Sequence, residues 1–146
     1  MPLERHYILA ALKERCGVTV EDDIPIGMMN LSGVRPFGII EIEEETANMF
    51  NMQVDKCMGM TVDGLLGSKT GSWIFSSAIN LALANPLTIV TFTMSCPECT
   101  ISDSLFFQLH YRPAAKGKIH ERHIHVQFIA LGHVFKGFLA PQVKAI

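Results

Sequence analysis

The sequence predicts an α+β domain in which a curved antiparallel sheet wraps around one central buried helix. Residues 65–84 are apolar or small almost throughout, so a helix at this place has no polar stripe to turn toward water. Downstream, short runs rich in β-branched or aromatic residues are bounded by Pro or Gly, as is typical of strands. These runs cover residues 87–94, 104–112, 119–131 and 133–139. A sheet that curves around the helix is the simplest way to bury both.

The part before the central helix is predicted to hold one further helix and two strands. Residues 3–16 have the spacing of an amphipathic helix, which Gly17 ends and which we expect on the outside of the sheet. Residues 18–31 and 37–42 are predicted strands, and the acidic run 43–45 marks a solvated end. Residues 46–56 fit either a helical turn or a loop.

The two strands 104–112 and 119–131 each have one apolar face and one mixed face. Alternate residues point to opposite sides of a strand, which separates the two sets. The apolar set is Leu105, Phe107, Leu109, Tyr111, Ile124, Val126, Phe128 and Ala130. A hairpin turning around Ala115 would place Gln108 beside His123 and Phe106 beside His125, so the mixed faces coincide.

Composition limits the classes of function. The 146 residues, 1–146, predict a single domain, and 49% hydrophobic against 18% charged residues predicts a homodimer or tetramer. A net charge of −2 without a basic cluster argues against nucleic acid as a partner. The charged N-terminus and the lack of a run of about 20 apolar residues predict a cytoplasmic protein with no membrane partner.

The predicted architecture resembles the hotdog fold, and in particular thioesterases of the phenylacetate-degradation and hydroxybenzoyl-CoA type. In that family one strand precedes the central helix and four follow, and an Asn-x-x-Gly-x-x-His-Gly-Gly stretch leads into the helix. Residues 56–64 align with this stretch, with Gly59 and Gly64 at glycine positions. Lys56 stands where the Asn is expected, Val62 where the His is expected and Asp63 where a glycine is expected. The resemblance implies an acyl-CoA partner. The family's helix carboxylate would fall near Gly71 or Ser72 in this chain, so Asp63 is the candidate carboxylate near the thioester.

Asp63 has two interpretations. As the N-cap of the helix, its carboxylate accepts a backbone N–H for about 1 kcal/mol. As a catalytic base, it activates water while the free N–H groups near Gly64 and Leu65 receive the thioester oxygen.

The predicted pocket walls are Met58, Met60 and Trp73. Six methionines precede or begin this region, and thioethers suit either a flexible acyl pocket or ordinary core gaps. Trp73 is expected to be buried beside the helix start, so Trp73→Ala is expected to cost about 3–5 kcal/mol.

A metal site is the remaining alternative. Cys96 and Cys99 form a lone C-x-x-C, and a closed zinc site needs two further ligands. His123 and His125 share one strand face, whereas His120 lies on the other. We therefore predict reduced thiols, no zinc and no cofactor.

The leading functional hypothesis is an acyl-CoA thioesterase-like protein that binds an acyl or aryl thioester of coenzyme A and hydrolyses it slowly through Asp63. The first rival is a non-catalytic ligand-binding or assembly module on the same hotdog scaffold. The second is a small metal-binding protein.

Overall fold

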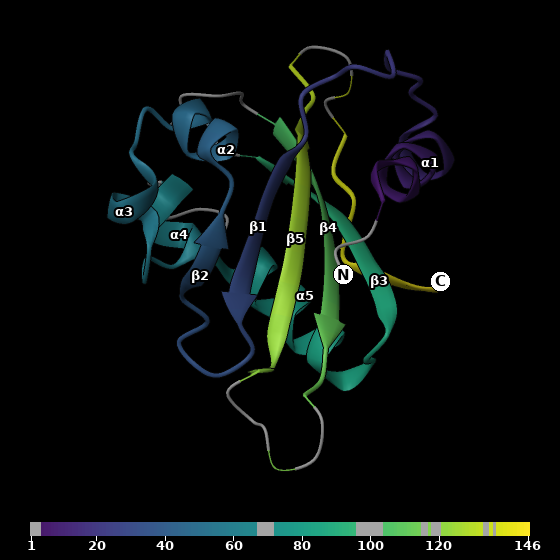
Figure 1. The fold of residues 1–146 in the computed structure, drawn as a ribbon. Coiled ribbons are helices and arrows are strands. Elements are labelled where there is room, and N and C mark those ends of the chain that lie inside the picture. The colour runs from purple at the N-terminus through teal and green to yellow at the C-terminus, as the bar shows by residue number, and fades with distance from the viewer. Residues whose placement is uncertain are drawn as a thin grey trace.

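The computed structural model describes residues 4–66, 72–95, 104–114, 117, 121–132, 135 and 137–146. These residues form an α+β fold with five helices and six strands (Figure 1). The helices are α1 (Arg5–Cys16), α2 (Glu44–Met49), α3 (Val54–Cys57), α4 (Val62–Leu66) and α5 (Ser72–Ala84). The strands are β1 (Gly27–Ser32), β2 (Ile39–Ile42), β3 (Thr88–Ser95), β4 (Ser104–Arg112), β5 (His123–Ala130) and β6 (Gln142–Ala145).

The six strands form one antiparallel sheet in the order β2-β1-β5-β4-β3-β6. Two strands precede helices α2 to α5, whereas the hotdog family has one strand before its central helix. These two strands, β1 and β2, form a hairpin that joins the sheet beside β5. The predicted strand 18–31 is wrong before Gly27, and residues 18–26 run as turns and loop. The predicted strand 133–139 is also wrong for its described residues, and β6 lies further on.

The register of β4 and β5 differs from the predicted one. Gln108 pairs with Gln127, and His110 pairs with His125, so β5 is displaced by four residues relative to the predicted hairpin. A displacement by an even number leaves every side chain on its predicted face. The predicted faces are therefore confirmed, whereas the predicted neighbours are wrong.

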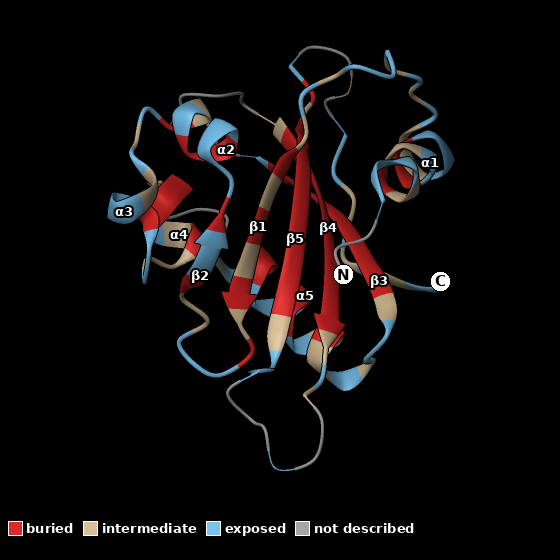
Figure 2. Cartoon of the chain, viewed as in Figure 1, coloured by how far each residue is buried: buried red, intermediate tan, exposed pale blue. Residues whose placement is uncertain are grey.

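The inner face of the sheet carries the main core. The apolar sets of β4 and β5 lie in or against one buried cluster together with α4 and α5. At its centre the ring of Phe107 packs against three other rings, with centroid distances of 5.3 Å to Phe92, 5.4 Å to Phe75 and 5.4 Å to Phe128. The central strands β4 and β5 are buried except at their ends, as Figure 2 shows.

Helix α1 covers part of the outer face, as the sequence predicts. It ends at Gly17, which has the left-handed φ of 67° that favours glycine at a helix C-terminus. Phe106 and Ile129 are buried in a second cluster with the apolar side of α1, whose buried residues are Ile8, Ala11 and Leu12. Helix α1 therefore covers these two residues of the outer face, and they are not exposed to another copy of the chain. The homodimer or tetramer stays a prediction.

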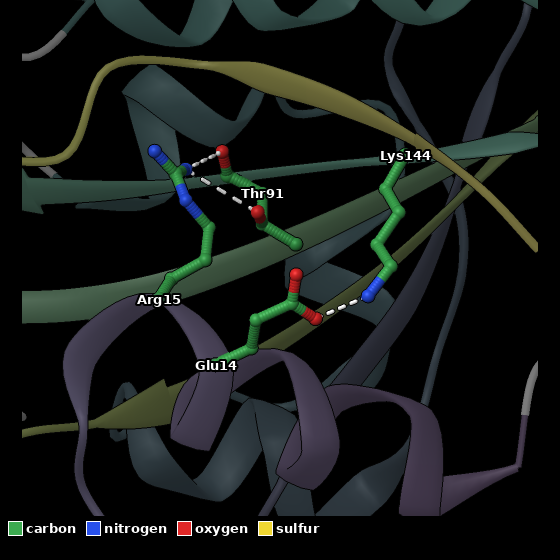
Figure 3. A network of polar contacts seen from close by, with 4 residues as sticks. All are labelled: Glu14, Arg15, Thr91 and Lys144. Carbon is green, nitrogen blue, oxygen red and sulfur yellow. Dashed lines mark hydrogen bonds and ion pairs between the residues drawn. The ribbon is translucent and has the colours of Figure 1, made fainter.

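Polar contacts fasten the C-terminal end of α1 to the sheet edge. The guanidinium of Arg15 donates to the backbone oxygen of Thr91 at 2.6 Å and to that of Ala140 at 3.0 Å. Next to it, Lys144 on β6 forms an ion pair with Glu14 (Figure 3). These contacts link the first helix with strands β3 and β6 (Figure 3).

The predicted central helix is two helices, and the second is not buried all round. Helix α5 packs on the inner face of the sheet through Phe75, Ala78 and Ile79, while Ser76 and Asn80 are exposed. Apart from Trp73, the outer side of α5 is thus a stripe of small or polar residues, which the apolar composition of the whole segment masks. The prediction of a central helix with no side facing water is therefore wrong.

The burial of Trp73 is also wrong, because its side chain is 64% exposed at the start of α5. We expect red-shifted, readily quenched emission from this single tryptophan, and a change of no more than about 0.5 kcal/mol in unfolding free energy for Trp73→Ala. Fluorescence with acrylamide quenching and urea denaturation measure both quantities. Blue-shifted emission shielded from acrylamide would contradict the placement of α5.

Gly38 lets the β1–β2 hairpin dock against the segment before α4. The backbone N–H of Ile39 donates to Met60 and its carbonyl accepts from Gly59, both at 2.8 Å. A Cβ on Gly38 would lie 2.9 Å from the backbone oxygen of Gly59. We expect Gly38→Ala to lower the free energy of unfolding by about 1–3 kcal/mol, because backbone must move to admit the methyl group.

Gly64→Ala is the matched control for Gly38→Ala. The nearest atom to its Cβ would be 3.4 Å away, which is ordinary contact, and the site lies within α4. Alanine there should raise the free energy of unfolding by about 0.4–1 kcal/mol. Urea denaturation that gives both variants the same stability would show that the hairpin is not docked in this way.

Candidate functional site

The start of α4 is built around Thr61. Its hydroxyl accepts the backbone N–H of Gly64 at 3.1 Å, and its carbonyl accepts the N–H of Leu65 at 3.0 Å. Thr61 is therefore the N-cap, and the prediction that Asp63 caps the helix is wrong. The predicted oxyanion donors are wrong as well, because both N–H groups already have acceptors within the helix start.

Asp63 instead turns a carboxyl oxygen into the protein. Its Oδ1 is buried and has no hydrogen-bond partner among the described residues. Burial raises the pKa of the Asp63 carboxyl above its ordinary value, because the charged form loses hydration. A buried acceptor without a partner costs about 1–3 kcal/mol, so this oxygen is a group that a ligand or water can satisfy.

Asp63 lines a cavity of about 70 Å³ between the β1–β2 hairpin and helices α4 and α5. The remaining walls come from β1, from the turn after it and from the inner side of α5. They are Leu31, Pro36, Phe37, Thr61, Val62, Phe75, Ser76 and Ile79. Apart from Asp63, the walls carry the side-chain hydroxyls of Thr61 and Ser76 and six apolar side chains. The cavity therefore has a mixed polar and apolar lining that includes one carboxyl group.

Two structural features shape this cavity. Phe37 has a φ of 61°, a left-handed conformation that is unusual for a residue with a Cβ, and it follows the tight turn of the hairpin. Phe75 and Ile79 lie four residues apart, so they share one face of α5. The spacing of these last two residues was visible in the sequence, whereas the approach of Phe37 from the hairpin was not.

The other predicted pocket residues do not line the cavity. Met58 is exposed in a shallow, open depression of about 630 Å³ beside α2 and α3. Met60 packs against the core beside Gly64, and Leu65 belongs to the core itself. Trp73 lies at the surface. Of the predicted site residues, only Asp63 reaches the cavity with its side chain.

The candidate metal ligands do not converge where they are described. His125 Nδ1 faces Asn30 Oδ1 at 3.0 Å, whereas His123 Nδ1 faces the carbonyl of Glu121 at 3.1 Å. In the described part of the chain no three His, Cys, Asp or Glu side chains are grouped as a metal site. Cys96, Cys99 and His120 lie outside the described residues, so the absence of zinc stays a prediction.

The two described cysteines are free thiols, as predicted. Cys16 is half-buried and Cys57 is buried in the core. Burial raises the pKa of both thiols, which keeps them protonated and poorly reactive. Neither lines the Asp63 cavity.

No protein-family model matches the chain, and neither a curated protein nor a solved structure matches it. Within the described ranges, no helix combines the length and apolar character that crossing a membrane requires.

Proposed function

We propose that this protein is a non-catalytic ligand-binding module that takes the short acyl end of a coenzyme A thioester into the Asp63 cavity. The observation that carries the proposal is the buried, unpartnered carboxyl oxygen of Asp63 at a small cavity whose other side chains are mostly apolar. A protonated carboxyl donates a hydrogen bond to a carbonyl oxygen, and burial favours that protonated form. A thioester carbonyl with a small apolar tail meets both requirements.

The size of the cavity supports a short acyl group. Pockets for drug-sized ligands measure about 300–1,000 Å³. A cavity of about 70 Å³ instead has room for a group of acetyl size. A long acyl chain would need the hairpin or the helices to move.

The assignment of the fold as hotdog-like belongs to the same proposal. The antiparallel sheet with α5 on its inner face supports it. The pair of strands before the helices and the exposed outer side of α5 depart from it.

Rapid hydrolysis is not part of the proposal, because the site has few of the groups that turnover needs. Gly64 and Leu65 use their N–H groups within α4, and no histidine is among the cavity walls. Any thioester cleavage should therefore be slow.

Calorimetry with acetyl-CoA, benzoyl-CoA, palmitoyl-CoA and free coenzyme A, beside a thiol-release assay, tests the proposal. Of these four ligands, we expect acetyl-CoA to bind most tightly. Asp63→Asn should keep binding, since the amide also donates, and should abolish residual hydrolysis. Asp63→Leu should weaken binding by about tenfold or more, because the carbonyl loses its donor.

Asp55 on α3 provides the control for these variants, since it is an exposed acid outside the cavity. Asp55→Asn and Asp55→Leu should leave binding unchanged. Binding that is equally strong for free coenzyme A would remove the acyl pocket from the proposal. Rapid turnover that survives Asp63→Asn would show a catalytic site elsewhere.

A further inference from the structure

A line of side-chain hydrogen bonds crosses three strands on the outer face of the sheet. On β2, Glu41 Oε1 accepts from Asn30 Nδ2 at 2.9 Å. On β1, Asn30 Oδ1 lies 3.0 Å from Nδ1 of His125, which stands directly opposite on β5. The line therefore joins the N-terminal hairpin to the centre of the sheet.

The direction of these bonds defines the state of the histidine. A carboxylate only accepts, so Asn30 gives its amide N–H to Glu41 and turns its oxygen to the ring. His125 must then carry its proton on Nδ1, which leaves Nε2 as a bare acceptor. The residue is 4% exposed, and Nε2 is buried with no partner in the described part of the chain.

The surroundings of His125 disfavour a second proton on the ring. His110 stands directly opposite on β4, and burial together with the positive charge of His110, His123, the amino terminus and Arg112 lowers the pKa of His125 to about 4. The acids on this side are Glu41, reached through Asn30, and Glu43, which lines a second cavity of about 90 Å³ together with Asn30 and His125. Protonation would place a buried N–H at Nε2 without an acceptor.

Strand β1 separates this line from the Asp63 cavity. Asn30 faces outward, while the next residue, Leu31, faces inward and lines the cavity. The hairpin that follows supplies Pro36 and Phe37 to the same walls. Movement of β1 away from β5 would therefore remove three walls of the cavity.

We propose that Asn30 and His125 form a proton-operated latch that holds the β1–β2 hairpin against β5 and keeps the Asp63 cavity closed. An open hairpin would admit longer acyl chains to the cavity, and this part of the proposal rests on the proposed function. The opening of the hairpin itself does not. Opening exposes the ring to water, where one proton from solvent binds Nε2. Apart from this N–H bond, no covalent bond forms or breaks.

The expected size of the effect follows from proton linkage. In the open hairpin the ring is hydrated, which removes the largest cause of its lowered pKa, while His110 and Arg112 remain beside it on β4. A rise in the pKa of His125 from about 4 to its ordinary value of 6.5 would increase the opening equilibrium about 30-fold between pH 7.5 and pH 5, which is therefore the upper limit. Opening should remain confined to β1 and β2 in that range, since the inner core of β3 and β4 carries no part of the latch.

Hydrogen exchange of the ligand-free protein at pH 7.5 and pH 5, corrected for intrinsic rates, tests the latch itself. The amides of β1 that bond to β5 should lose protection by up to about 30-fold relative to those between β3 and β4. His6→Gln is the control, since His6 is an exposed histidine on α1 outside the latch, and this variant should keep the pH dependence. Equal loss of protection in β1 and β3, or none in β1, would overturn the latch.

Asn30→Asp combined with Glu41→Gln reverses the polarity of the line without removing it. The new carboxylate pairs with the charged ring and accepts from the new amide. The hairpin of this double variant should stay protected at pH 5. An opening as large as in the unchanged protein would overturn the latch even if the first experiment agreed with it.

Binding of palmitoyl-CoA to Asp63→Asn, which has no carboxyl to titrate at the cavity, tests the link to ligand size. We expect tighter binding at pH 5 than at pH 7.5, and no such gain when the double variant is added. Hairpin opening without any acyl-CoA binding at either pH would reject the proposed function and leave the latch standing. If the hairpin opens at pH 5 but palmitoyl-CoA binds equally well at both pH values, hairpin opening does not control which acyl chains enter the cavity.

Discussion

Phe107→Ala is expected to lower the free energy of unfolding by about 3–5 kcal/mol. Phe107 is 1% exposed and stands at the centre of the inner core, with its ring packed against Phe75, Phe92 and Phe128. Removing the ring leaves a cavity that these neighbours, held on a helix and two strands, cannot fill completely. Aromatic pairs of this geometry add about 0.5–1.5 kcal/mol beyond the buried area.

Urea denaturation of the variant beside Phe138→Ala checks this result. Phe138 is exposed, so its removal should change the stability by no more than about 0.5 kcal/mol. Phe107→Leu fills part of the space and should lie between the two. A loss of less than 1 kcal/mol for Phe107→Ala would mean that α5 does not pack on β3, β4 and β5 as described.

Lowering the pH from 7 to 4 is expected to reduce the stability by about 3 kcal/mol through His125 alone. Its pKa is lowered from 6.5 to about 4 in the folded protein, first by burial and then by neighbouring positive charge. Between these values the unfolded chain binds a proton that the folded chain does not. Stability is therefore complete above pH 6.5 and is lost as the pH falls toward 4.

Urea denaturation at several pH values between 7 and 4 measures this slope. His125→Gln should reduce this slope, because the amide can meet Asn30 and does not titrate. Part of the slope should remain, because burial also lowers the pKa of His110. His6→Gln, at an exposed site on α1, should keep the slope of the unchanged protein. A slope that does not depend on His125 would contradict its burial as a neutral ring.

Periodicity made part of the fold predictable. The alternation along β4 and β5 identifies the inner face because one side of each strand is continuously apolar, and Gly17 marks the end of α1. The same reasoning fails for α5, where Ser76 passes as a core residue although small polar residues line the solvent side. The position of β6 and the register of the β4–β5 hairpin depend on pairing between distant residues, which local pattern does not contain.

The candidate site was predictable only in part. Asp63 stands out because an acid follows a β-branched residue at a helix start, yet Thr61 two positions earlier fits the cap equally well and takes that role. Phe37 reaches the cavity only because the hairpin docks near α4. Asn30 and His125 are 95 residues apart, so their contact has no signal in sequence spacing.

Nuclear Overhauser contacts from the methyl group of ¹³C-acetyl-labelled acetyl-CoA, recorded at saturating ligand, test the central claim most directly. The acetyl group in the Asp63 cavity should give contacts to the side chains of Phe37, Phe75 and Ile79, with the thioester intact at the end of the experiment. Contacts to Met58 in the open depression beside α3 would place the ligand at another site. Absence of contacts to any residue would contradict the Asp63 cavity as a binding site for acyl thioesters.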